Sequence, residues 1–215
     1  MILNTGMYTH YYIPPANEAE LRAYVLSHPF AHLITATQQA GLHCTAVATV
    51  QEPSEDAACF TLLAHLAKRN PHAAALDHAD SALLLFPGAH AYISPRWYAS
   101  RAEVPTWNYI AVQARGTLEL IDDVGGIESV LRRTIQSVER EQREPWTLDM
   151  APREVVERLL PNVRAFRIRV QRLEGTFKVS QNKSAADRKG VIDALRAKGD
   201  GDSVAMAALI AEAPR

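Results

Sequence analysis

The chain has 215 residues, 47% of them hydrophobic, and its 23 Lys and Arg residues against 24 Asp and Glu residues give a formal net charge of −1. This composition predicts one folded domain, or a domain with an appendage, and excludes a disordered chain. The balanced charge excludes strong attraction of the whole molecule to nucleic acid or acidic membranes, so any basic site must be local.

The first half of the chain predicts one helix followed by strands. Asn17 is expected to cap a helix that runs to about His28, where Pro29 ends it. Strands are expected over 31–38, 42–51 and 57–65, separated by turn signals. Asn70 and Pro71 predict the start of a short helix. Two apolar strands, 82–87 and 89–94, are then expected on either side of Pro87-Gly88, followed by a strand over about 105–121.

The second half is expected to be mainly helical. Apolar spacing predicts a helix over 123–141, and a shorter one follows over 152–160. Alternation predicts strand over 163–179, broken or bulged at Gly175. Ser184 with Asp187 predicts a capping box for a helix to about Lys198, and a last helix covers 202–212. Runs of strands with short turns and few βα repeats favour a barrel-like α+β fold.

The two cysteines, Cys44 and Cys59, fit neither a zinc site nor a disulfide framework, and the eight histidines lack paired metal-ligand spacing. No metal site is therefore expected, and the thiols are expected mainly to pack. The start of the chain lacks a signal-peptide pattern, and the longest apolar run, from Ala82 to Phe86, is too short to span a bilayer. These observations predict a soluble, cytoplasmic protein.

The predicted strand from Pro105 to Gly116 has two unlike faces. One face is small or branched and suits a core. The other joins aromatic rings to amide and guanidinium groups: Trp107, Tyr109, Gln113 and Arg115. Such a face suits a flat anionic ligand with polar edges, or a subunit interface. An aromatic surface strand packed under a loop fits the pattern equally well.

A second candidate site lies at the turn before the predicted helix at Pro71. Lys68 and Arg69 precede Asn70 there, and the hydroxyl of Thr61 lies upstream. Free N–H groups at a helix N-terminus favour an anion such as phosphate, and the two cations would strengthen the attraction. The alternative is that both cations are solvated residues beside a capped helix.

Two further patches join aromatic and polar residues. His90, Tyr92 and Ser94 share one strand face ahead of Trp97 and Tyr98, which suits either a pocket wall or a wet strand face. Polar donors also gather at the predicted strand-to-helix joint: Lys178, Ser180, Gln181 and Asn182. They can hold a ring edge or a phosphate, or serve as ordinary turn residues.

Taken together, these patches resemble the PaiB family of FMN-binding negative transcriptional regulators. The matching motifs are Met7-Tyr8, His65 to Pro71, Gly88 to Tyr98, Val104 to Tyr109, Leu173 to Lys183 and Asp187 to Ile192. The sequence departs from the family pattern in the short link from Ala102 to Pro105, in Gln113 to Gly116 and in Ala46 to Thr49. These departures affect the expected rim and charge of the pocket.

The resemblance implies an α+β split β-barrel like that of pyridoxamine-phosphate-oxidase-type flavoproteins, with peripheral and C-terminal helices. Residues 1–180 would form the FMN-binding domain, including a helical insert over about 122–160, and residues 181–215 a helical extension. It also implies a homodimer with FMN at the subunit boundary. By position, Thr61, Lys68, Arg69 and Asn70 would hold the phosphate, Trp107, Tyr109, Gln113 and Arg115 would line the site, and Lys178, Gln181 and Asn182 would close it.

The implied function is negative transcriptional regulation rather than dedicated catalysis, and no catalytic residue is assigned. A flavin-dependent oxidoreductase of the pyridoxamine-phosphate-oxidase type is the alternative, because the cofactor itself would carry the redox chemistry. Direct DNA binding is a third hypothesis, based on the basic residues of the C-terminal helix. Asp187, Asp193 and Asp200 interrupt that basic set, and no helix-turn-helix pair is evident.

Overall fold

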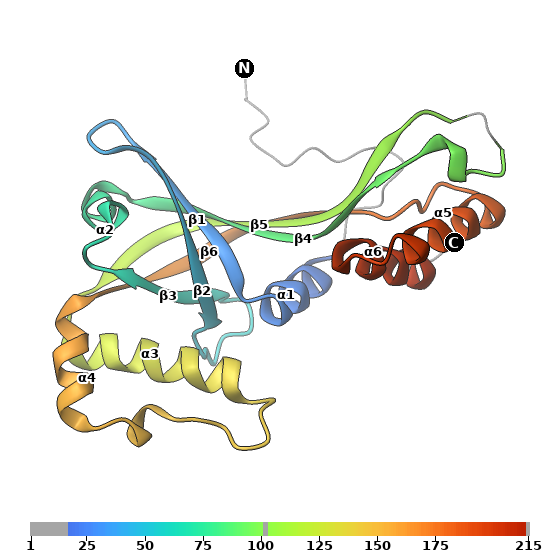
Figure 1. Ribbon diagram of the computed structural model, residues 1–215. Helices are drawn as coiled ribbons and strands as arrows, with labels where there is room; N and C mark the ends of the chain where they lie inside the picture. The colour runs from blue at the N-terminus through green and yellow to red at the C-terminus, as the bar shows by residue number, and fades with distance from the viewer. Residues whose placement is uncertain (1–16, 101–102, 214–215) are drawn as a thin grey trace. The chain divides into compact units, whose positions relative to one another are not determined.

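The computed structural model describes residues 17–100 and 103–213 (Figure 1). The Met7-Tyr8 motif, and Ala102 in the short link before Pro105, lie outside the described residues. With η for 3₁₀ helices, the elements are α1 (Glu18–Ser27), β1 (Phe30–Thr37), β2 (Gly41–Gln51), β3 (Thr61–Ala67), α2 (Pro71–Ala75), η1 (Leu76–His78), β4 (Ser81–Ile93), η2 (Pro95–Trp97), β5 (Thr106–Ile121), α3 (Val124–Glu139), η3 (Leu148–Met150), α4 (Arg153–Leu159), η4 (Leu160–Asn162), β6 (Val163–Lys178), α5 (Ala185–Lys198) and α6 (Gly201–Glu212).

The strands form a closed barrel in the order β1-β2-β3-β6-β5-β4. Antiparallel registers join β1 to β2, β1 to β4, β2 to β3 and β3 to β6. The α+β barrel class predicted from the sequence is therefore confirmed. In the described part of the chain, no helix is long and apolar enough to cross a membrane.

Helix starts follow the predicted caps. The Asn17 side chain accepts from the Glu20 N–H at 2.9 Å, while the Glu20 carboxylate accepts from the Asn17 N–H at 3.0 Å. Asn70 accepts from the His72 N–H, and Ser184 from the Asp187 N–H. Each cap satisfies N–H groups that the first helical turn leaves without a partner.

Three predicted strand boundaries were wrong. The predicted strand over 57–65 begins only at Thr61. Asp56 holds the residues just before Thr61 in a turn, because its side chain accepts from the Ala58 N–H and its carbonyl oxygen accepts from the Cys59 N–H. β4 runs unbroken through Pro87, which is exposed, and a strand tolerates proline where its missing N–H faces no partner strand. β6 also continues through Gly175. A Cβ there would lie 2.4 Å from the Leu21 side chain, so this glycine permits a close contact rather than a break.

The chain divides into two compact units. The barrel unit comprises residues 22–86 and 113–173, and the second unit comprises the described parts of 1–21, 87–112 and 174–215. The boundary expected near residue 180, between an FMN-binding domain and a helical extension, stays a prediction.

In the barrel unit, β3 is buried on both faces. Leu62 and Ala64 face the interior with Phe166 of β6, and all three are buried. Leu63, on the opposite face, joins the apolar cluster under α3 and α4 that includes Ile127, Val130, Val156 and Leu160. Figure 1 shows α3 and α4 on this side of the barrel. The helical insert expected from the sequence therefore covers the outer faces of β3 and β6.

In the second unit, α5 and α6 pack against each other (Figure 1). Val191, Leu195 and Met206 are fully buried between them. Arg188 on α5 donates to the carbonyl oxygens of Ile210 and, at 2.7 Å, Ala213, so it satisfies acceptors at the C-terminal end of α6.

The Asp187 to Ile192 motif also ties α5 to the segment around η2. The Asp187 carboxylate accepts from the Ser100 N–H at 2.9 Å and from the Ser184 hydroxyl at 2.8 Å. These bonds lower the pKa of Asp187, the Ser100 N–H most of all. A Cβ at Gly190 would lie only 2.1 Å from the Trp97 carbonyl oxygen, so the two backbones touch at that glycine.

Candidate cofactor-binding site

The predicted site residues fall into both units. The barrel unit holds Thr61, Lys68, Arg69, Asn70, Gln113 and Arg115. The second unit holds Trp107, Tyr109, Lys178, Gln181 and Asn182. Their joint role in binding one cofactor stays a prediction.

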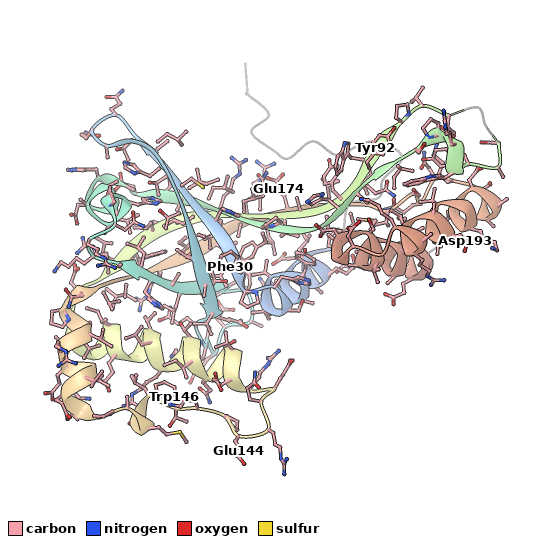
Figure 2. The ribbon with its side chains drawn as sticks, viewed as in Figure 1. Phe30, Tyr92, Glu144, Trp146, Glu174 and Asp193 are labelled. Carbon is pink, nitrogen blue, oxygen red and sulfur yellow. The ribbon has the colours of Figure 1, made fainter. Side chains whose placement is uncertain are left out.

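The barrel unit has an apolar outer face formed by β1, β2 and β4. Outward residues of the three strands meet in register: Ala46, His32 and Leu85 form one row, and Cys44, Ile34 and Leu83 form the next. Phe30, labelled in Figure 2, is 61% exposed, and Leu42 is 75% exposed. We call these residues the outer barrel face. None of these residues belongs to the apolar cluster that packs under α3 and α4.

The two thiols lie in different environments. Cys44 is exposed on the outer barrel face, and Cys59 is half-buried with its sulfur 3.5 Å from the Thr61 hydroxyl. Both are free thiols. The expected packing role is therefore wrong for Cys44.

Gln113 and Arg115 lie on the outward side of β5, which follows β4 in the barrel. Arg115 Nη2 donates to Gln113 Oε1 at 3.0 Å. Its Nε is buried and has no hydrogen-bond partner among the described residues. A buried donor without an acceptor is costly, so this guanidinium is suited to an external oxygen or an anion.

The turn before α2 keeps its two cations available. Lys68 and Arg69 are exposed, while the Lys68 N–H donates to the Asn162 carbonyl at 2.8 Å. Asn70 serves the fold: its oxygen caps α2, and its nitrogen donates to the Thr45 hydroxyl at 3.4 Å. Because α2 has only five residues, its dipole adds little, and any anion site here depends on the Lys68 and Arg69 side chains.

Thr61 lies at the opposite end of β3 from Lys68. Seven steps along an extended chain place their Cα atoms about 23 Å apart, so one phosphate cannot contact both. Thr61 is also buried. An elongated ligand could reach both ends of the strand, and the predicted role of Thr61 as a ligand stays a prediction.

A buried polar cluster around His72 was missed by the sequence analysis. His72 is 1% exposed, with Nε2 2.9 Å from the Thr35 hydroxyl, Nδ1 3.0 Å from the Thr45 hydroxyl and its ring stacked on His43. Burial, followed by the charge of His43, lowers the pKa of His72. The only signal in the sequence was the position of His72 behind the Asn70-Pro71 helix start, and that signal does not specify its partners.

In the second unit, the predicted alternation along β5 is confirmed. Asn108 and Ile110 are buried, whereas Trp107 is 52% exposed and Tyr109 is half-buried. The Trp107 ring lies 5.6 Å from the His90 ring and 6.2 Å from Tyr92 of β4, which is labelled in Figure 2. The two strands therefore present a stripe of exposed rings.

The strand-to-helix joint is largely internal structure. Gln181 accepts from the Val179 N–H at 2.9 Å and donates to the Phe177 carbonyl. Ser180 is buried, adopts a positive φ of 59° and accepts from the Asn108 side chain at 2.8 Å. The Gln181 side chain therefore shapes the turn.

The two remaining residues of this joint differ in environment. Asn182 is exposed. Lys178 Nζ donates to the Thr106 hydroxyl at 2.6 Å, and burial together with the neighbouring Lys183 lowers the pKa of Lys178. The expected role of Lys178, Gln181 and Asn182 in closing the site stays a prediction.

Comparison with known proteins gives both family and fold. The family model described as "Putative FMN-binding domain" matches residues 7–172. The "Protease synthase and sporulation protein PAI 2" of Bacillus subtilis is 28% identical over 204 residues, covering 95% of this chain and 96% of that protein. An uncharacterized protein of Aspergillus fumigatus is 34% identical over 175 residues, covering 65% of this chain and 67% of that protein.

Two solved structures have a similar fold. The flavocytochrome Anf3 of Azotobacter vinelandii gives a TM-score of 0.58 at 14% identity, over 80% of this chain and 72% of that one. The conserved hypothetical protein Rv2991 of Mycobacterium tuberculosis gives a TM-score of 0.56 at 14% identity, over 83% of this chain and 94% of that one. Together with the barrel topology, they confirm the expected split-barrel fold. The resemblance to PaiB and the assignment of FMN as the family's cofactor are also confirmed, and the chain belongs to this family of FMN-binding domains.

Proposed function

We propose that the protein acts as a homodimer that binds FMN and represses transcription. Membership of the FMN-binding family supports the cofactor. The resemblance to PaiB and the similarity to the sporulation protein of Bacillus subtilis support the regulatory role. The dimer is supported by the outer barrel face, which is the observation that carries the proposal.

The outer barrel face has the composition of a subunit interface. Most of its residues are apolar, and they lie in register across three strands. Leaving the most exposed of them, Phe30 and Leu42, in water would cost free energy. The buried Nδ1 of His32, within this face, has no hydrogen-bond partner among the described residues. A second copy would cover the apolar surface and bring polar groups to its edge.

The residues of the barrel unit fit FMN. The unpartnered Arg115 Nε, with the rest of the guanidinium fork, suits a phosphate or carbonyl oxygen. Lys68 and Arg69 supply two further exposed cations. When bound, FMN would supply redox chemistry at its ring. The part played by Trp107 and Tyr109, whose rings suit stacking on a flat ligand, stays a prediction.

DNA contact through α5 gains little support. Lys183 Nζ lies 2.5 Å from Glu103, Lys189 Nζ lies 2.5 Å from Asp193, and Lys198 Nζ lies 3.0 Å from Asp200. These carboxylates offset much of the basic charge predicted for this helix. We therefore propose that any effect on transcription depends first on the FMN-binding dimer.

Ile34→Glu tests the dimer. It places a charge in the centre of the outer barrel face, and we expect a dimer in the wild type and a monomer in the variant by light scattering. Val204→Glu, at an exposed position on α6, is the matched control and should remain dimeric. A wild-type monomer, or an Ile34→Glu variant as dimeric as the control, would refute the dimer.

Arg115→Gln tests the cofactor site. Loss of a charged hydrogen-bond donor is expected to raise the Kd for FMN about 10- to 100-fold, measured by flavin absorption during titration. Arg158→Gln, an exposed change on α4, should leave the Kd unchanged. Equal affinity in the two variants would remove Arg115 from the site.

Transcript profiling tests the regulatory role. Deletion of the gene should raise a set of transcripts, and the wild-type gene should lower them again, whereas the Ile34→Glu and Arg115→Gln genes should not. An unchanged transcript profile would refute repression. Turnover of a reduced nicotinamide or of pyridoxamine phosphate by the pure protein would instead favour an oxidoreductase.

A further inference from the structure

We propose that the groove between α5 and α6 in the second unit is a binding site for a small organic anion with an apolar body, such as an aromatic carboxylate or sulfonate. The groove has a volume of about 610 Å³, which lies in the range of small-molecule sites. All of its lining residues belong to the second unit, so the proposal rests neither on FMN binding nor on the dimer.

The groove combines an apolar wall with a basic rim. Ile192 of α5 is half-buried and Ala211 of α6 is exposed, so apolar surface faces the groove from both helices. Arg188 crosses from α5 to the carbonyl oxygens at the end of α6 and fixes the spacing of the two helices. A preformed apolar wall favours a ligand with a ring or short hydrocarbon body.

The rim carries a surplus of positive charge. Four cations line the groove, namely Lys183, Arg188, Lys189 and Arg196, against the single carboxylate of Asp193. Asp193, labelled on α5 in Figure 2, pairs with Lys189, and Glu103 pairs with Lys183. Because Arg188 is buried and engaged with the carbonyl oxygens of α6, the surplus positive charge at the rim is that of Arg196.

Arg196 is the cation best placed to recognise the anion. It is exposed at the groove and makes no hydrogen bond or ion pair with the residues that the structure describes. Its planar fork suits the paired oxygens of a carboxylate or sulfonate. The surplus charge would exclude cationic ligands and makes the expected affinity dependent on salt.

The experiment uses 8-anilinonaphthalene-1-sulfonate as the probe and calorimetric titration of the full chain saturated with FMN. We expect one probe per chain. N-phenyl-1-naphthylamine, which has the same rings without the sulfonate, should bind at least tenfold more weakly. Equal binding of the two compounds would overturn the assignment of an anion site.

Variants locate the probe. Arg196→Gln should weaken the sulfonate about five- to tenfold and leave the neutral compound unchanged, while Arg158→Gln should change neither. Ala185→Trp, an exposed lining position, should block both compounds. Flavin absorption should be the same in all of these variants. Wild-type affinity for the sulfonate in Arg196→Gln or Ala185→Trp would overturn the proposal. Loss of sulfonate binding in Ile34→Glu would also overturn it, because the probe would then bind to the outer barrel face.

Discussion

Replacement of Gly190 by alanine sets two opposing effects against each other. Alanine inside a helix is favoured over glycine by about 0.5–1 kcal/mol. The new Cβ, however, would lie 2.1 Å from the Trp97 carbonyl oxygen, more than 1 Å inside ordinary contact. Backbone moves less readily than a side chain, and overpacking of this kind costs about 1–3 kcal/mol. We expect the clash to win, with a net loss of about 1–2 kcal/mol.

Thermal unfolding measures this loss, which corresponds to a fall in Tm of roughly 2–8 °C for a chain of this size. Gly201→Ala is the control, because a Cβ at Gly201, the first residue of α6, meets nothing within 4 Å. It should be neutral or slightly stabilising. If Gly190→Ala were as stable as Gly201→Ala, the close approach of α5 to η2 would be refuted.

Two further predictions concern buried polar groups. Because the pKa of His72 is lower in the folded protein than in the unfolded chain, the unfolded chain binds a proton first as the pH falls. The neutral His72 therefore contributes its full stabilisation above about pH 6.5, and this contribution is lost at lower pH. His72→Gln should therefore show a smaller drop in urea stability between pH 7.5 and 5.5 than the wild type, and an equal drop would contradict the assignment. Asn108→Ala should lower the free energy of unfolding by about 1–3 kcal/mol, because it leaves the buried Ser180 hydroxyl without its donor. Urea unfolding at pH 7.5 measures this loss, and a variant as stable as the wild type would show that water replaces the bond.

Local sequence signals predicted most of the elements. Asn17, Asn70 and Ser184 marked helix starts because a capping side chain acts on N–H groups only two or three residues away. The alternation along β5 predicted which residues would be buried because a strand between interior and exterior must alternate. Both rules act within a few residues, so the sequence is sufficient to apply them.

Features set by distant contacts were not predictable. Gly175 predicts a break in the strand, but in the structure it leaves room for the Leu21 side chain. Leu21 is far away in the sequence, so this contact cannot be inferred from residues near Gly175. His72 on α2 is buried against Thr35 of β1 and Thr45 of β2. The sequence likewise grouped Thr61 with Lys68, because it cannot show that the whole of β3 separates them.

The pairing of β3 with β6 has a consequence for biosynthesis. Thr61 pairs with Arg169, about a hundred residues later, so the ribosome must release most of the chain before the barrel can close. Until then, the edge of β3 that pairs with β6 has unpaired backbone N–H and C=O groups, and its leucines, which are buried in the folded protein, are exposed. Nascent chains stalled between β3 and β6 should therefore need chaperone protection, whereas chains released beyond Lys178 should not.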